Sequence, residues 1–217
     1  MTEITFTDQV TPGTVRRMST GPSGLLLGVG PTGQPMTLSL FRPQPTRIFV
    51  ALPEFQTWLI AFRAVCLGAH LSVIAADHRR WLTLADAVRA AGGTVDVLHD
   101  ADALPGRGRP YRPSLIVDEV EAVPATRRLG AWQSVLAVGD PGASAAVAML
   151  RASDGALIAP LESRAAEQLR RAYALTSGQV RTAADIGASE VAMATFRRVA
   201  TVTVVPSAEE YRLLFGG

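Results

Sequence analysis

The sequence predicts an α/β fold in which helices connect the strands of a mostly parallel β-sheet. Short apolar runs alternate with segments of helical period from residue 48 to residue 175, and such alternation favours right-handed crossovers between parallel strands. The chain has 217 residues, of which 48% are hydrophobic and 18% charged, so it can bury one sizeable core. We find no internal repeat and no linker. We therefore expect an N-terminal arm over residues 1–20 and one domain over residues 21–217.

The first predicted elements are strands. Two strands, residues 25–29 and 36–41, flank a Gly-Pro-Thr-Gly turn and form an expected hairpin. A buried strand follows at residues 48–51. Apolar residues then recur with helical spacing over residues 55–67, and Gly68 is placed to end that helix.

The remaining elements continue the alternation up to a C-terminal hairpin. Asp77 and a Gly-Gly pair mark the start and end of a second helix. The predicted strands are 70–76, 94–99, 114–121, 132–140 and 155–160; the predicted helices are 77–93, 141–153 and 162–175; residues 189–206 form the hairpin, and residues 207–215 a last helical turn.

Composition excludes several classes of protein. No apolar run approaches the ~20 residues of a membrane span, and the N-terminus lacks the pattern of a secretory signal. The single cysteine, Cys66, excludes an internal disulfide, and three histidines without neighbouring ligands make a metal site improbable. We expect a cytoplasmic protein in which Cys66 is a buried, inert thiol.

All 21 basic residues are arginines, and the chain contains neither lysine nor asparagine. Without lysine there is no phosphate-loop lysine, no Schiff base and no lysine general base. The arginine pairs are spread along the chain without forming a block. A nucleic-acid interface requires clustered positive charge, so we predict no nucleic-acid partner.

Four segments, taken together, resemble the P-loop ATPase motors of secretion and conjugation, the VirB4/TraG and FtsK/EccC branch of the RecA-like fold. They follow the order of that family's entry hairpin, the segment after its phosphate loop, its Walker B strand and its C-terminal tail. The segments are residues 25–41, 67–98, 113–124 and 155–214. The resemblance implies a three-layer RecA-like, P-loop NTPase-like sheet with N-terminal and C-terminal β-hairpins.

The place of the phosphate loop departs from that family. The turn after the strand at residues 48–51 has no glycine and no lysine, so it lacks the backbone freedom and the charge that hold phosphates. If Pro53 is set against the family's loop proline, the lysine position falls near Trp58 and the hydroxyl position near Leu59. The degenerate Walker A region is then Leu52, Pro53, Glu54, Phe55, Gln56, Thr57, Trp58 and Leu59.

Walker B carboxylates remain at Asp118 and Glu119. In an active relative the aspartate would hold magnesium and the glutamate would orient the attacking water. The simpler interpretation is that they cap the next turn or pair with an arginine. The following strand would present a polar sensor residue in active relatives, and here that position falls near Val138 and Gly139.

From this resemblance we expect a catalytically inactive ATPase-like scaffold or regulatory subunit, with no catalytic residue, no cofactor and no metal ion. Its partner would be a protein, such as a secretion or conjugation motor ATPase, and it could also assemble with copies of itself. The arginine-only composition adds the expectation of a type VII-like apparatus in an actinobacterium, with the chain peripheral to a membrane complex.

Two alternatives stay open at the level of sequence. The first is a nucleotide sensor that binds without hydrolysis, which needs backbone donors at residues 52–57. The second is an unrelated small-molecule enzyme at the C-terminal edge of the sheet, where open α/β folds bind ligands. That enzyme would need a deep pocket near Asp77, Asp118 and Asp140.

Overall fold

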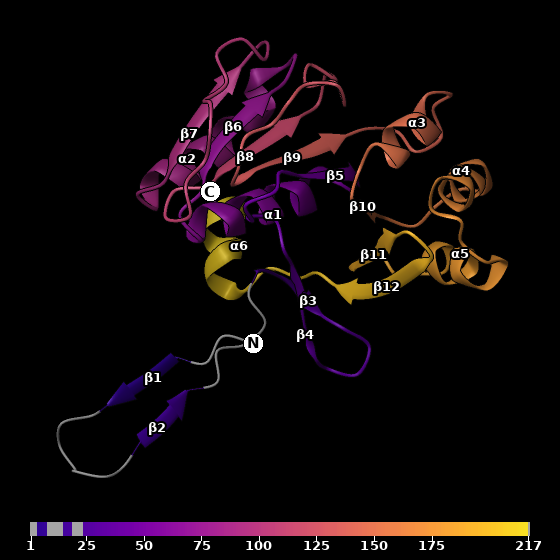
Figure 1. The fold of residues 1–217 in the computed structure, drawn as a ribbon, viewed down its shortest axis with the longest axis horizontal. Helices are drawn as coiled ribbons and strands as arrows, with labels where there is room; N and C mark the ends of the chain where they lie inside the picture. Colours follow the sequence, from indigo (N-terminus) through magenta and orange to yellow (C-terminus); the bar gives the residue numbers. More distant parts are fainter. Residues whose placement is uncertain (1–3, 8–14, 19–23, 217) are drawn as a thin grey trace.

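The computed structural model describes residues 4–7, 15–18 and 24–216, and these form a two-stranded sheet and a ten-stranded sheet (Figure 1). The strands are β1 (Ile4–Thr7), β2 (Val15–Met18), β3 (Leu25–Val29), β4 (Pro35–Leu38), β5 (Thr46–Ala51), β6 (His70–Ile74), β7 (Thr94–Leu98), β8 (Ser114–Asp118), β9 (Gln133–Val138), β10 (Gly155–Ile158), β11 (Glu190–Thr195) and β12 (Arg198–Thr203). The helices are α1 (Glu54–Cys66), the 3₁₀ turn η1 (His78–Trp81), α2 (Leu82–Ala90), α3 (Ala146–Arg151), α4 (Ser163–Tyr173), α5 (Ser177–Ala184) and α6 (Ala208–Phe215).

The large sheet has the order β4-β3-β12-β11-β10-β5-β9-β8-β6-β7 and is mostly parallel. Strands β10, β5, β9, β8, β6 and β7 run parallel to one another. Asp118 of β8 lies beside Ile74 of β6 and Ala137 of β9. The mostly parallel α/β sheet expected from the sequence is therefore present. Because β5 and β8 run in the same direction, their carboxyl ends lie at the same edge of the sheet. This edge is where a ligand of such a fold would bind.

The remaining strands extend the sheet in antiparallel fashion. β11 pairs with β10 and β12, β12 pairs with β3, and β3 pairs with the edge strand β4. The turn between β11 and β12 holds Arg197 at φ 58, and these two strands form the hairpin expected over residues 189–206. Of the expected N-terminal arm, only β1 and β2 are described, paired with each other, and the rest of residues 1–20 lies outside the described residues.

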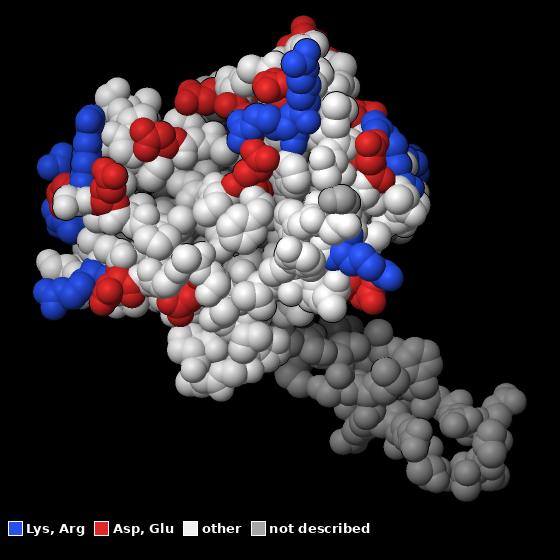
Figure 2. All heavy atoms as spheres, turned by 180° about the vertical axis from the view of Figure 1, so that it is seen from behind, with Lys and Arg blue, Asp and Glu red and all other residues white. Residues whose placement is uncertain are grey.

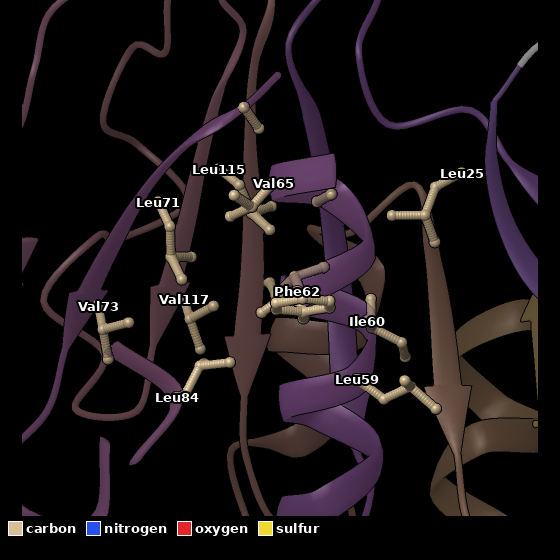
Figure 3. Packing of buried hydrophobic residues seen from close by; sticks show 14 of the residues in the cluster. Leu25, Leu59, Ile60, Phe62, Val65, Leu71, Val73, Leu84, Leu115 and Val117 are labelled. Atoms are coloured by element: carbon tan, nitrogen blue, oxygen red, sulfur yellow. The ribbon is translucent and has the colours of Figure 1, made fainter. Parts of the chain in front are cut away.

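One face of the sheet carries α1, α2 and α6. Alternate residues of β5 show the division: Ile48 and Val50 belong to this side, and Phe49 belongs to the opposite side. Figure 3 shows Phe62 and Val65 of α1 directed toward the side chains of β6 and β8. This cluster is the main core of the protein.

The opposite face is covered in two different ways. Helices α3, α4 and α5 pack over β5, β10 and β11, with Leu150, Leu169 and Ala183 fully buried. Over β8 and β9 the cover consists of the connections 99–113 and 119–132, whose Leu104 and Leu129 pack on the sheet. Helices on both faces of one sheet make three layers.

Three helices differ from the sequence expectation. The helix expected over residues 77–93 is divided into the 3₁₀ turn η1 and the shorter α2. The helix expected over residues 141–153 shortens to α3, because Asp140 accepts a hydrogen bond from the Gly142 N–H at 2.7 Å and holds residues 140–145 in turns. Helix α5 was missed, although Thr176 and Gln179 form a capping box at its start. Across the described residues, no helix combines the length and the apolar character that crossing a bilayer requires.

Cys66 is exposed at the last residue of α1, so the expectation of a buried thiol is wrong. The helix ends there because Gly68 adopts φ 89 and turns the chain toward β6. Partial burial, followed by the nearby carboxylate of Glu210, raises the pKa of the Cys66 thiol. Exposure makes the thiol accessible to reagents, whereas the raised pKa lowers the fraction of reactive thiolate.

Candidate functional site

The connection between β5 and α1 consists of two residues, Leu52 and Pro53. A phosphate loop instead places about eight residues of glycine-rich motif around the start of the helix. The N–H groups of Gln56 and Thr57 both donate to the carbonyl of Pro53, at 3.1 and 3.2 Å. Pro53 itself has no N–H to offer, so few backbone donors remain at this place.

The first residue of α1 supplies a negative charge. The carboxylate of Glu54 accepts two hydrogen bonds from the guanidinium of Arg80, one of them from Nε at 2.8 Å. This hydrogen bond is the main cause that raises the pKa of Arg80. A carboxylate in the first turn is stabilised by the helix dipole, and it would repel a phosphate at the same position.

Trp58 and Leu59 lie in the second turn of α1. A phosphate-loop lysine and hydroxyl directly precede or begin the helix, whereas Trp58 and Leu59 lie one turn further along, so the pairing of these positions stays a prediction. Leu59 is fully buried in the main core. Trp58 stacks on Phe215 of α6, with ring centroids 6.4 Å apart, and tilts against Trp81 at 6.3 Å. Both side chains therefore hold elements together.

Asp118 is only 2% exposed, and its carboxylate organises the connection that follows β8. Its Oδ1 accepts from the N–H groups of Val120 at 3.2 Å and Ala122 at 3.0 Å, and its Oδ2 accepts from Val123 at 2.8 Å. Between these residues Glu121 adopts φ 55. The geometry matches the capping role considered for Asp118 at the sequence level.

Glu119 forms contacts with the start of α2. Its Oε2 accepts a hydrogen bond from Nε1 of Trp81 at 3.0 Å, and its Oε1 lies 4.0 Å from a guanidinium nitrogen of Arg80. Arg80 also binds Glu54, so one arginine joins the Walker B position to the start of α1. The sequence carries no local signal for the roles of Arg80 and Trp81. Arg80 lies 26 residues from Glu54 along the chain, and Trp81 lies 38 residues from Glu119.

The expected sensor position gives no polar side chain. Val138 ends β9, and the N–H of Gly139 donates to the carbonyl of Val50 at 3.0 Å. A side chain at residue 139 would come within 3.1 Å of the Phe49 ring. Residues 138 and 139 thus serve the packing of the sheet end.

The three aspartates proposed for an unrelated enzyme do not share a pocket. Asp77 accepts from the N–H of Arg79 at 3.0 Å and starts η1, while Asp140 caps its own turn. Asp118 lines a hollow of about 210 Å³ together with Arg47, and neither Asp77 nor Asp140 lines it. Ligand pockets are ordinarily about 300–1,000 Å³, which weighs against this alternative.

Residues that could hold a metal ion do not gather in the described part of the chain: no group of three or more His, Cys, Asp or Glu side chains has a suitable arrangement there. His70 instead bridges Thr94 and Asp96, each at 2.9 Å. His78 and His99 stack with ring centroids 3.8 Å apart. The absence of a bound cofactor or metal ion in this protein stays a prediction.

The chain is similar to known proteins in its structure and not in its sequence. No protein-family model and no curated protein sequence matches the chain. Among solved structures, VirB4 of Thermoanaerobacter pseudethanolicus is similar with a TM-score of 0.61 at 9% identity, over 88% of this chain and 98% of that one. The genome packaging NTPase B204 of Sulfolobus turreted icosahedral virus 2, solved with AMP, gives 0.52 at 6% identity, over 76% of this chain and 100% of that one.

The fold is similar to the folds of this VirB4 and of this packaging NTPase. In the parallel order β10-β5-β9-β8-β6-β7, β5 is the second strand and lies between β10 and β9. Leu52, Pro53 and Glu54 directly follow β5, and their equivalence to a nucleotide position stays a prediction. Identities below 10% carry the fold and nothing about activity.

Proposed function

We propose that this protein is a catalytically silent P-loop ATPase-like domain that acts through protein contacts. The observation that carries the proposal is the two-residue connection between β5 and α1. Backbone N–H groups that wrap phosphates need a longer, glycine-rich path. A helix that starts directly after Pro53, with the carboxylate of Glu54 in its first turn, offers neither the path nor the charge.

The remaining carboxylates support the same proposal. Asp118 is engaged by three backbone N–H groups, and Glu119 is engaged by Trp81 and Arg80. A magnesium ion would have to compete with these bonds at Asp118. The nucleotide-sensor alternative finds little support, because Pro53 has no N–H and the N–H groups of Gln56 and Thr57 are already bonded.

The surface that we propose for protein contacts is the β3–β4 end of the sheet. Residues 18–41 contain no charged side chain, and Figure 2 shows the β3–β4 hairpin as a lobe without blue or red atoms at the lower edge. Leu26 is 51% exposed and Val29 46%, and β4 is the edge strand. Neutral edges with exposed apolar side chains favour association.

The partner we propose is a motor ATPase of a secretion-type apparatus, of the type VII-like kind, with self-assembly as a further possibility of the same surface. The resemblance to the VirB4/TraG and FtsK/EccC branch supports this choice, and one structural neighbour is a VirB4. The actinobacterial setting is part of the same proposal and rests on the arginine-only composition.

A phosphate-release assay tests the inactivity. We expect the protein with ATP and Mg²⁺ to release phosphate at the rate of the buffer blank, and we expect Glu119→Gln to behave identically. Release by the wild-type protein that exceeds the blank and falls in Glu119→Gln would contradict the proposal, since it would give Glu119 the water-orienting role of an active ATPase.

A further inference from the structure

A hollow of about 460 Å³ lies over the half of the sheet that no helix covers on that face. Its walls come from two connections, residues 104–107 and residues 127–131. Ile116 of β8 and Gln133, the first residue of β9, also line it. It is therefore separate from Leu52 and Pro53, which follow the carboxyl end of β5. The volume is within the usual range of small-molecule sites.

The lining of this hollow is positively charged. It includes Arg107, Arg127 and Arg128 and no acidic residue. A second hollow, of about 420 Å³, shares Arg127 and Arg128 and adds Arg47. Four arginines therefore line the two hollows, and the guanidinium of Arg47 also donates to the carbonyls of Val123 and Pro124.

The second hollow contains one carboxylate, Asp154, and it is already engaged. Asp154 accepts from the backbone N–H of Arg47 at 2.8 Å and pairs with Arg42 at 3.1 Å. The positive charge of Arg127 and Arg128 is thus not neutralised by Asp154. Among the described residues, neither Arg107 nor Arg128 forms an ion pair.

The walls are held in place before any ligand arrives. The buried side-chain amide of Gln133 donates to the carbonyls of Pro105 and Gly106, at 3.0 and 2.8 Å. Its carbonyl oxygen accepts from the N–H of Gly130 at 2.9 Å. One glutamine therefore joins the two connections, and a preorganised site loses less entropy on binding.

The positions of two arginines are fixed by direct contacts. The side chain of Arg107 packs on Gly130, where an added Cβ would come within 2.8 Å of its Cγ. Arg127 donates to the carbonyl of Ala101 at 2.9 Å. Arg107 and Arg127 thus line the hollow from different connections.

We propose that this arginine hollow binds a small phosphorylated anion, and specifically a group with two or more phosphates. Guanidinium groups bind phosphate oxygens through paired hydrogen bonds. Two adjoining hollows that share Arg127 and Arg128 can accept one phosphate on each side of that pair. This site is independent of the silent nucleotide position, since it lies beyond the amino ends of β5 and β9.

Calorimetric titration with inorganic pyrophosphate, without added magnesium, tests the proposal. The test variant is Arg107→Gln with Arg128→Gln, which keeps much of each side chain but removes two charges. The matched control is Arg89→Gln with Arg171→Gln, two exposed arginines on α2 and α4 that line neither hollow and lose the same charge. Circular dichroism of all three proteins verifies that each is folded.

We expect one pyrophosphate per chain, with an affinity that falls at least tenfold in the test variant and less than twofold in the control. No measurable binding to the wild-type protein at millimolar pyrophosphate would overturn the proposal. Equal weakening in both variants would overturn it as well, because general attraction by net charge would then explain the binding.

Discussion

The indole Nε1 of Trp81 donates a hydrogen bond to the carboxylate of Glu119 across 3.0 Å, and so joins α2 to the end of β8. The resemblance gives Glu119 the place of a glutamate that would orient the attacking water in an active relative. Here it faces a side chain from the same molecule, which supports a structural role for the position.

That hydrogen bond predicts an energetic coupling between Trp81 and Glu119. In a double-mutant cycle of Trp81→Phe with Glu119→Ala, we expect a coupling of about 1 kcal/mol in the free energy of unfolding. Trp58→Phe is the control, because the Nε1 of Trp58 has no hydrogen-bond partner among the described residues. Its coupling with Glu119→Ala should be close to zero, and equal couplings for both tryptophans would refute the assignment.

The three backbone bonds of Asp118 predict that Asp118→Asn destabilises the protein by about 2–3 kcal/mol in urea unfolding. The neutral amide keeps a single acceptor oxygen and turns a donor toward the N–H groups. Asp140→Asn, at a turn where one backbone bond is accepted, should cost less than about 1 kcal/mol. If Asp118→Asn left stability unchanged, the carboxylate would be free for another function.

Arg63 and Glu210 form a bidentate pair, at 2.7 and 2.8 Å, that fastens α6 to α1. Hydrogen bonding from Arg63 lowers the pKa of Glu210. This contribution is therefore complete above the ordinary carboxyl pKa of about 4.3 and is lost as the pH falls through the lower folded-state value.

We expect urea unfolding of the wild-type protein to show a loss of stability on acidification that is smaller in Glu210→Gln. At pH ~7, Arg63→Met should cost about 2–3 kcal/mol, since it leaves a half-buried carboxylate without its partner. An identical acid dependence in wild type and Glu210→Gln would show that the pair does not contribute.

Cys66 should react slowly despite its exposure. Its raised pKa reduces the thiolate fraction at neutral pH, and the thiolate is the reactive form. We expect iodoacetamide to alkylate it more slowly at pH ~7.5 than an unstructured cysteine peptide, with a midpoint of the rate-versus-pH curve above about 8.5. A rate equal to or above that of the peptide would contradict this.

The sequence was most informative where structure depends on neighbouring residues. The apolar runs of β5 and β8, the helix end at Gly68 and the turn started by Asp77 all follow from local chemistry. Helix α5 was harder to predict, because Ala183 is its one buried residue and its apolar pattern is correspondingly weak.

The candidate site could be predicted only in part. The missing glycine and lysine after β5 are visible in the sequence, and so are Asp118 and Glu119. The hydrogen bonds between Glu54 and Arg80 depend on the packing of η1 near the start of α1, which the sequence does not show. The residue at which α1 begins depends on backbone geometry, which the sequence does not show either. The arginine hollow could not be predicted, because Arg107 and Arg127 lie on connections that are separate in the sequence and are joined in space by Gln133.

The most direct test of the central claim is a calorimetric titration of the Arg107→Gln/Arg128→Gln variant with ATP and Mg²⁺, because anion binding at the arginine hollow is expected to be at least tenfold weaker in this variant. We predict no heat of binding and no shift in melting temperature, because the connection of Leu52 and Pro53 is short and Glu54 adds a negative charge. Magnesium-dependent ATP binding by this variant, weakened by Asp118→Ala, would contradict the account and would show that the nucleotide position still works.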